Sequence, residues 1–208
     1  MSDADHQLAA IELGDQPDAW RTAGFAVDTS GRLQLGSTEI RLTGRGGTPA
    51  WSIVGVDAPI DGLPVVRDAD RDPAAATAHP NGITRIDHVV ISTGDGDRTV
   101  DAFTSAGLPP RRTREVTDGP HPMRQTFCWA GDVIIEIVAP LEPDGAAPLA
   151  ATWFGLALVA DDLDDTAARL GDLLSTPRDA VQAGRRIAGL RHLEIGISLP
   201  VAVMSPHR

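Results

Sequence analysis

The chain has 208 residues, of which 42% are hydrophobic and 23% are charged, a composition typical of a soluble globular protein with one large or two small domains. Its formal net charge of -11 makes nucleic acid an unexpected partner, because an acidic chain neutralises phosphates poorly. No apolar run approaches the roughly 20 residues of a membrane span, so we expect no membrane association. The 18 basic residues are all arginine, which excludes lysine Schiff-base chemistry.

The N-terminus is polar and acidic, which argues against a secretory signal peptide. Cys128 is the one cysteine of the chain, so an intramolecular disulfide is impossible. A single thiol is typical of proteins in a reducing compartment. We therefore expect a cytoplasmic protein.

Three stretches of the chain, at about 8–42, 83–140 and 153–206, repeat one order of predicted elements. Each begins with a short apolar run that predicts a strand, followed by acidic residues typical of a helix start. Strand-like sequence follows each predicted helix. This repeat divides the chain into residues 1–78, a short first module with a linker, and residues 79–208, which hold two further modules.

Turn residues mark where the predicted elements end. Gly24 and Gly107 follow the first two predicted helices at the position where a C-terminal cap is expected. Asp15, Asp95 and Asp162 are candidate residues for the helix starts. The connector 44–82 is rich in Gly, Pro and Asp and is expected to hold one extra strand at 51–56 and a long linker, and 141–152 is a second, shorter linker.

The second and third stretches resemble a known family. Residues 79–91 and 127–140 resemble the first and fourth strands of a vicinal-oxygen-chelate (glyoxalase/bleomycin-resistance) module, and 155–164 resembles the opening of the next module. The resemblance implies an α+β fold in which two βαβββ modules pair into a curved, open, mixed sheet around a cleft. The first stretch is then a degenerate third module, which packs on the outside or pairs with its copy in a homodimer, the assembly we favour.

In that superfamily the first and fourth strands supply metal ligands, which implies that His88 and Glu136 bind a divalent metal. Imidazole and carboxylate suit zinc, iron, nickel or manganese. Glu136 would also be the catalytic residue that moves a proton. The residues alone leave three interpretations open, namely a metal site, a structural His–Glu hydrogen bond, and a metal-free polar site, because a carboxylate flanked by apolar residues needs some polar partner.

The other modules depart from this ligand pattern. In the third module Gly155 stands where His88 would be, and Ala202 or a nearby small residue stands where the carboxylate would be. In the first module Arg41 aligns with Glu136. His192 and Glu194, on one face of a predicted strand, are possible substitutes, although a surface position is the simpler expectation.

Further polar residues are candidates for the cleft. Guanidinium and amide groups there would hold an anionic substrate, and the candidates are Arg112, Arg114, Arg124 and Gln125. The alternative for the arginines is solvated charge on strand edges. His121 lies in a loop that either closes over the cleft or forms a surface turn, and Cys128 and His79 are expected to be structural.

Two functions are compatible with this pattern. The first is a divalent-metal-dependent lyase, isomerase or dioxygenase-type enzyme acting on a small oxygen-rich metabolite. The alternative is a metal-free protein that binds or sequesters a small molecule, of the bleomycin-resistance type. The ligands kept in the middle module favour the first function, and those lost in the third favour the second.

Overall fold

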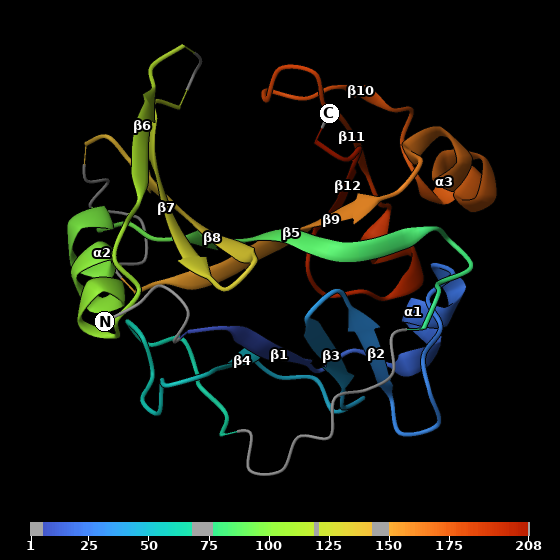
Figure 1. Cartoon of the computed structure of the whole chain (residues 1–208), viewed down its shortest axis with the longest axis horizontal. Coiled ribbons are helices and arrows are strands. Elements are labelled where there is room, and N and C mark those ends of the chain that lie inside the picture. Colours follow the sequence, from blue (N-terminus) through green and yellow to red (C-terminus); the bar gives the residue numbers. More distant parts are fainter. Residues whose placement is uncertain (1–5, 68–76, 119–120, 143–149, 208) are drawn as a thin grey trace.

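The computed structural model describes residues 6–67, 77–118, 121–142 and 150–207. The chain forms a four-stranded sheet and an eight-stranded sheet, which lie as two layers in Figure 1. Both sheets contain parallel and antiparallel pairs. The α+β class expected from the sequence is confirmed.

The eight-stranded sheet is built from two βαβββ modules. The middle module consists of β5 (Ile83–Ser92), α2 (Gly96–Ser105), β6 (Arg112–Val116), β7 (Met123–Ala130) and β8 (Val133–Pro140). The third module consists of β9 (Thr152–Ala160), α3 (Leu163–Leu170), η1 (Gly171–Leu173), β10 (Arg178–Asp179), β11 (Arg186–Gly189), η2 (His192–Ile195) and β12 (Val201–Met204).

The strand order is β10-β11-β12-β9-β5-β8-β7-β6. From each edge of the sheet to its centre, the strands are the second, third, fourth and first of one module. In each module the first strand runs parallel to the fourth, and the two first strands, β5 and β9, pair antiparallel at the centre. The sheet curves and stays open, with β6 and β7 rising on one side and β10–β12 on the other (Figure 1). This is the paired-module arrangement that the resemblance implied.

Helix boundaries follow local chemistry. Asp95 caps α2 by accepting a hydrogen bond from the Arg98 backbone N–H, and Asp162 caps α3 in the same way. Gly107 has a φ of 85° after α2, a left-handed conformation that favours glycine. Asp15 does not cap the first helix, since its carboxylate instead accepts hydrogen bonds from Trp20 Nε1 and the Ser198 backbone N–H.

The first module forms the smaller sheet from β1 (Leu8–Leu13), α1 (Pro17–Thr22), β2 (Arg32–Leu35), β3 (Thr38–Leu42) and β4 (Ala50–Ile53). Its strand order is β2-β3-β1-β4. Strand β3 runs parallel to β1, just as the fourth strand of each of the other two modules runs parallel to the first strand. The extra strand predicted at 51–56 is β4, which pairs antiparallel with β1, as β9 does with β5. Within its described residues the first module therefore has three of the four strands of the repeat.

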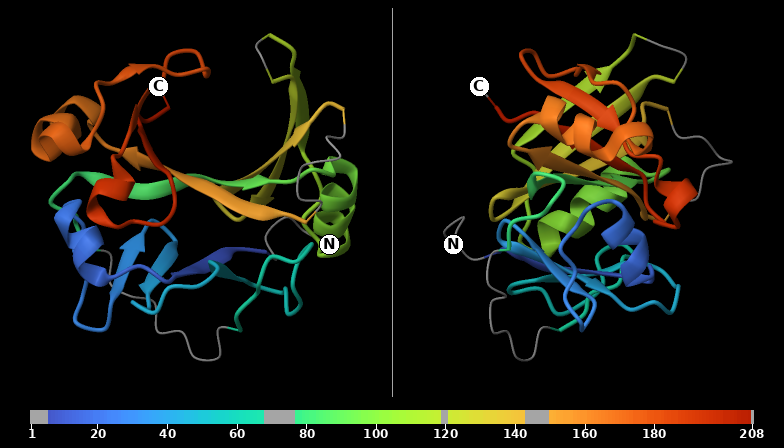
Figure 2. Two further views of the ribbon diagram at one scale, coloured as in Figure 1. Left: turned by 180° about the vertical axis from the view of Figure 1, so that it is seen from behind. Right: turned by 90° about the vertical axis from the view of Figure 1, so that its right-hand side faces the viewer.

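The smaller sheet packs beneath the larger one (Figures 1 and 2). A continuous cluster of buried hydrophobic residues joins them and includes Ile11 and Trp51 from below and Val89 and Ile91 from above. The Trp51 ring lies 4.9 Å from that of Trp153, centroid to centroid. The first module thus packs on the outside of its own chain's sheet, which leaves the cleft face free, and this core crosses the predicted boundary at residue 78.

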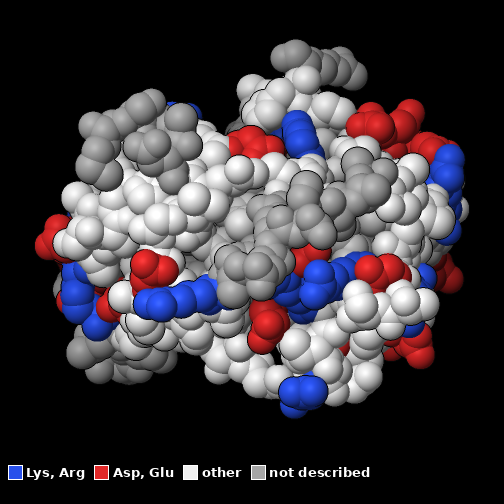
Figure 3. Space-filling view, turned by 60° about the horizontal axis from the view of Figure 1, so that its bottom comes forward, with Lys and Arg blue, Asp and Glu red and all other residues white. Residues whose placement is uncertain are grey.

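Acidic and basic side chains lie next to one another on the face that carries the first module (Figure 3). In the described part of the chain, no helix is long and apolar enough to cross a membrane. Parts of both predicted linkers, at 68–76 and 143–149, lie outside the described residues.

Candidate functional site

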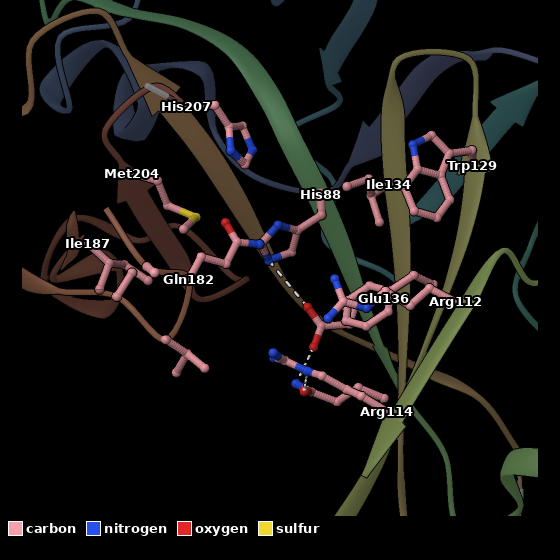
Figure 4. Close-up of a pocket in the computed structure, with 15 residues that line it drawn as sticks. His88, Arg112, Arg114, Trp129, Ile134, Glu136, Gln182, Ile187, Met204 and His207 are labelled. Carbon is pink, nitrogen blue, oxygen red and sulfur yellow. Dashed lines mark hydrogen bonds and ion pairs between the residues drawn. The ribbon is translucent and has the colours of Figure 1, made fainter. Parts of the chain in front are cut away.

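The concave face of the larger sheet holds a cleft of about 700 Å³. One wall comes from the middle module and carries Arg112, Arg114, Phe127 and Trp129. The opposite wall comes from the third module and is mostly apolar, with Val181, Ile187 and Met204. The cleft therefore joins a cationic, aromatic side to a mostly apolar side that also carries Gln182 and His207, as Figure 4 shows.

His88 and Glu136 lie together at the base of this cleft. His88 comes from β5 and Glu136 from the neighbouring parallel strand β8. The imidazole Nε2 is 3.5 Å from the carboxylate Oε2, and the two side chains are 16% and 11% exposed (Figure 4). The structure thus brings together the two candidate ligands.

Asp87 is a partner of His88 that the sequence analysis missed. Its Oδ2 lies 2.8 Å from Nδ1 of His88. Successive residues of a regular strand point to opposite faces, but Ile86 pairs with Leu158 and His88 with Ala157, so Asp87 is an extra residue in a β-bulge. The bulge allows two adjacent side chains to meet. An ionised carboxylate only accepts hydrogen bonds, so Nδ1 of His88 carries the proton.

Arg185 holds the other side of Asp87. Its side chain is 1% exposed, and Nη2 donates to Asp87 Oδ1 at 2.8 Å. Burial by itself raises the pKa of Asp87, but the hydrogen bonds from His88 and Arg185 outweigh it and hold that pKa well below its usual range. Asp87 is therefore ionised at neutral pH. Arg185 immediately precedes β11, and no local pattern distinguishes it from its neighbour Arg186.

Glu136 also has partners on the side that faces away from His88. Gln125 Nε2 donates to Glu136 Oε1, and Arg114 Nε donates to Gln125 Oε1 at 2.6 Å. These two bonds fix which way the Gln125 amide faces. The Arg114 guanidinium also lies over the Phe127 ring, 5.6 Å from its centroid. We call the resulting series of contacts the polar chain, Arg185–Asp87–His88–Glu136–Gln125–Arg114.

Arg112 lines the cleft as predicted, but Arg124 does not. Arg114 pairs with Gln125 across the hairpin and Glu115 pairs with Arg124, so Arg124 projects from the opposite face of the sheet. There its Nη2 contacts Asp97 Oδ1 at 2.6 Å. Arg124, which was predicted to bind substrate, therefore lies outside the set of residues that line this cleft.

The third module supplies no counterpart of the His88–Glu136 pair. The helix-capping residues Asp95 and Asp162 follow His88 and Gly155 at the same spacing, which makes Gly155 the equivalent of His88. A Cβ on Gly155 would lie 2.8 Å from the carbonyl oxygen of Pro200. Ala202 occupies the position equivalent to Glu136, two residues along from Gly155 in strand pairing.

The donor set does not fit a metal held by protein ligands alone. Among the described residues, no group of three or more His, Cys, Asp or Glu side chains is placed to hold an ion. The 3.5 Å between His88 Nε2 and Glu136 Oε2 would suit two ligands of one ion, given metal–ligand bonds of about 2.1 Å. Structural sites usually have four ligands and catalytic sites three. At this position the part of the chain that the structure describes supplies two.

The substitutes considered for the missing ligands lie elsewhere. His192 and Glu194 belong to the 3-10 helix η2 and not to a strand, which corrects the prediction of a shared strand face. His192 Nδ1 contacts the Ile197 carbonyl, and Glu194 pairs with Arg191. His121 is exposed and is not among the residues that line the cleft.

Two further candidates are structural, as expected. His79 accepts a hydrogen bond from the Ala26 backbone N–H and contacts the Gln34 carbonyl at 2.9 Å, so it ties the first module to the start of β5. Burial lowers its pKa. Cys128 is fully buried, and burial raises the pKa of its thiol to about 12, which rules it out as a nucleophile at neutral pH.

No protein-family model matches the sequence, and no curated protein matches it significantly. Among solved structures, methylmalonyl-CoA epimerase from Mycobacterium tuberculosis is similar, at 19% identity over 66% of this chain and 95% of that one, with a TM-score of 0.47. A Streptomyces coelicolor methylmalonyl-CoA epimerase variant in complex with 2-nitronate-propionyl-CoA has 20% identity, 61% and 99% coverage and a TM-score of 0.45. A hypothetical protein from Bacillus halodurans C-125 has 12% identity, 60% and 95% coverage and a TM-score of 0.46.

The strand order defines the fold of this chain. Two βαβββ modules that pair through their first strands around a cleft constitute the vicinal-oxygen-chelate, or glyoxalase-like, fold. At these identities and TM-scores the likeness to solved structures carries no functional argument. The fold alone leaves the function open, because it hosts many chemistries, so the function depends on the groups in the cleft.

Proposed function

We propose that the cleft binds a small, anionic, oxygen-rich organic molecule without a chelated metal. The observation that carries this proposal is the state of the two counterpart positions. Gly155 has no room for a Cβ beside the Pro200 carbonyl, and Ala202 offers no donor. His88 and Glu136 are thus half of a ligand set whose other half is sterically blocked at one position.

The charge of the ligand follows from the arginines on the cleft wall. The Arg112 side chain is exposed on this wall, while its backbone lies in the β6–β7 ladder. Arg114 is half-buried, with its Nε held by Gln125. Guanidinium groups bind carboxylates and phosphates through paired hydrogen bonds. An anionic group of the ligand is therefore expected beside Arg112 and Arg114.

The apolar side chains of the opposite wall favour a ligand that also has an apolar portion. Val181 is 85% exposed there, although the exposure of an aliphatic side chain of this size to water is unfavourable in free energy. Ile187 and Met204 extend the same surface into the cleft. A ligand with an anionic end and an apolar body would cover both walls, which is the usual make-up of a small-molecule site.

The second candidate is the metal-dependent lyase, isomerase or dioxygenase-type enzyme. It is favoured by the protonation of His88, because a proton on Nδ1 leaves the Nε2 lone pair facing Glu136 Oε2. Two acceptors that face each other repel, and a cation between His88 Nε2 and Glu136 Oε2 would relieve that repulsion. His88 and Glu136 would hold the metal, which would act as a Lewis acid when bound, and water or substrate oxygens would have to supply the remaining ligands.

Metal analysis combined with anion titration separates the two candidates. Calorimetric titration with benzoate, succinate and orthophosphate is made on the chelator-treated protein. We expect at least one of these anions to bind, with affinity reduced about tenfold or more in Arg114→Gln, since a charged hydrogen bond contributes about 1.5–3 kcal/mol. Arg124→Gln is the matched control, because Arg124 lies on a paired strand but on the opposite face.

Stoichiometric metal in the purified protein, lost in both His88→Ala and Glu136→Ala, would establish the metal-dependent candidate instead. Anion binding that appears only after metal is restored would have the same meaning. The homodimer and the cytoplasmic location stay predictions under either candidate.

A further inference from the structure

We infer that Asp87 and Arg185 are positioning residues, a buried pair from two modules that sets the His88 tautomer and links it to the loop forming one wall of the cleft. The inference rests on the contacts of Asp87 with His88 and Arg185 and does not depend on which candidate function holds. It adds two residues to the site for which the sequence pattern indicated no role.

The first observation is how completely the pair is buried and bonded. The Arg185 and Asp87 side chains are 1% and 5% exposed, and their contact is 2.8 Å. Arg185 Nε donates to the Ser205 carbonyl at 2.9 Å, and Nη1 donates to Gln182 Oε1 at 2.7 Å. A buried ion pair offsets its desolvation only when its other polar atoms are satisfied as well, and this pair meets that condition.

The second observation is the bulge in β5. Without it, Asp87 would alternate away from His88 and point to the other face of the sheet. Pairing instead runs from Ile86–Leu158 directly to His88–Ala157. A bulge gives up regular pairing and is often found where a side chain is re-aimed beside a functional site. Here it aims a carboxylate at Nδ1 of a cleft histidine.

The third observation is the origin of Arg185. It ends the loop between β10 and β11, whose residues 180–183 line the cleft. The backbone of Ala180 donates to the Arg185 carbonyl, and that of Arg185 donates to the Gln182 carbonyl, so the loop is closed on itself. One guanidinium therefore bonds both to a side chain of this loop and to the residue that orients His88. A displacement of the loop would be transmitted to the imidazole.

The substitution Asp87→Asn tests the tautomer directly. Arg185 donates to the Oδ1 position, so the amide oxygen of the new side chain must face Arg185 and its NH₂ group must face His88. A donor facing Nδ1 requires Nδ1 to be an acceptor. The proton of the neutral ring then moves to Nε2, where it points toward Glu136. The geometry of the site changes little, whereas the proton position reverses.

The readout is the long-range ¹H–¹⁵N spectrum of histidine side chains, recorded on the full-length protein at alkaline pH. The signals of His88 are identified by their loss in His88→Gln. We expect the Nδ1–H tautomer in the wild type, the Nε2–H tautomer in Asp87→Asn, and the wild-type tautomer in the control Asp97→Asn, whose carboxylate is 82% exposed on α2. The conservative variant Arg185→Lys, which keeps a cationic donor, should retain Nδ1–H.

The wild-type spectrum alone can overturn the inference, even if no variant folds, because an Nε2–H tautomer there contradicts it. Retention of Nδ1–H in a folded Asp87→Asn protein also contradicts it. Hydrogen exchange at the Ala180 and Arg185 amides tests the link to the loop, with exchange about tenfold faster expected in Asp87→Asn. Unchanged exchange rates at these two amides would show that Asp87 is not coupled to the loop.

Discussion

A Cβ on Gly155 would come within 2.8 Å of the Pro200 carbonyl oxygen, which itself accepts a hydrogen bond from the Leu156 backbone N–H. The position equivalent to His88 is therefore closed to any side chain as the backbone now stands. The third module has the same strand order as the middle module, but it has this close backbone contact at the position where the middle module has a polar side chain. The site is asymmetric for a steric reason as well as a chemical one.

Gly155→Ala is expected to lower the free energy of unfolding by about 1–3 kcal/mol, because the backbone near Pro200 must shift to admit one methyl group. Urea unfolding followed by circular dichroism measures the change. Gly189→Ala on β11 is the matched control, since a Cβ there has its nearest contact at 3.9 Å, with Ser175 Oγ. Equal effects of the two substitutions would contradict the steric account.

Asp87→Ala should lower the free energy of unfolding at pH 7 by about 3–5 kcal/mol, because it leaves Arg185 buried without its ion partner. The folded-state pKa of Asp87 is depressed, so its contribution is present above the unfolded value of about 3.9 and is lost as the pH falls below it. The difference between wild type and variant should therefore narrow below about pH 4. Urea unfolding at several pH values measures it.

The control for this pH series is Asp97→Ala, whose exposed ion pair with Arg124 contributes little. A gap between wild type and Asp87→Ala that stays constant down to pH 2 would show that the carboxylate is not the source of the stability.

His79→Gln tests the link between the first module and β5. Burial lowers the pKa of His79, so its neutral ring stabilises the fold above the unfolded pKa of about 6.5, and this contribution is lost as the pH falls through the lower folded value. The wild type should thus lose more stability than the variant between pH 7 and pH 5. Thermal unfolding across this range measures the difference, and parallel curves would contradict the assignment.

Cys128 should be unreactive in the folded protein. Its thiol is fully buried, and burial raises the thiol pKa to about 12, so almost no thiolate exists at pH 8. Labelling by Ellman's reagent is expected to be slow in buffer and to become complete within minutes in concentrated guanidinium chloride. Fast labelling of the native protein would mean that β7 opens readily.

Local patterns in the sequence were sufficient for the repeat and for the first pair of site residues. Alternating apolar residues, the aspartates before α2 and α3, and the glycines after α1 and α2 act over a few residues, so each element could be predicted. His88 and Glu136 could be paired because the first and fourth strands of one module are neighbours in the resembled fold. The gaps at Gly155 and Ala202 were visible for the same reason.

The tertiary structure alone decided which polar groups meet. Strand alternation turned Arg124 away from the cleft, while a bulge that pairing with β9 creates brought Asp87 to His88. Arg185 reaches Asp87 across the junction of two modules, a contact between residues far apart in the chain. Local sequence carries no record of register or of such distant contacts, so the His88–Glu136 pair was predictable, whereas the groups that orient it were not.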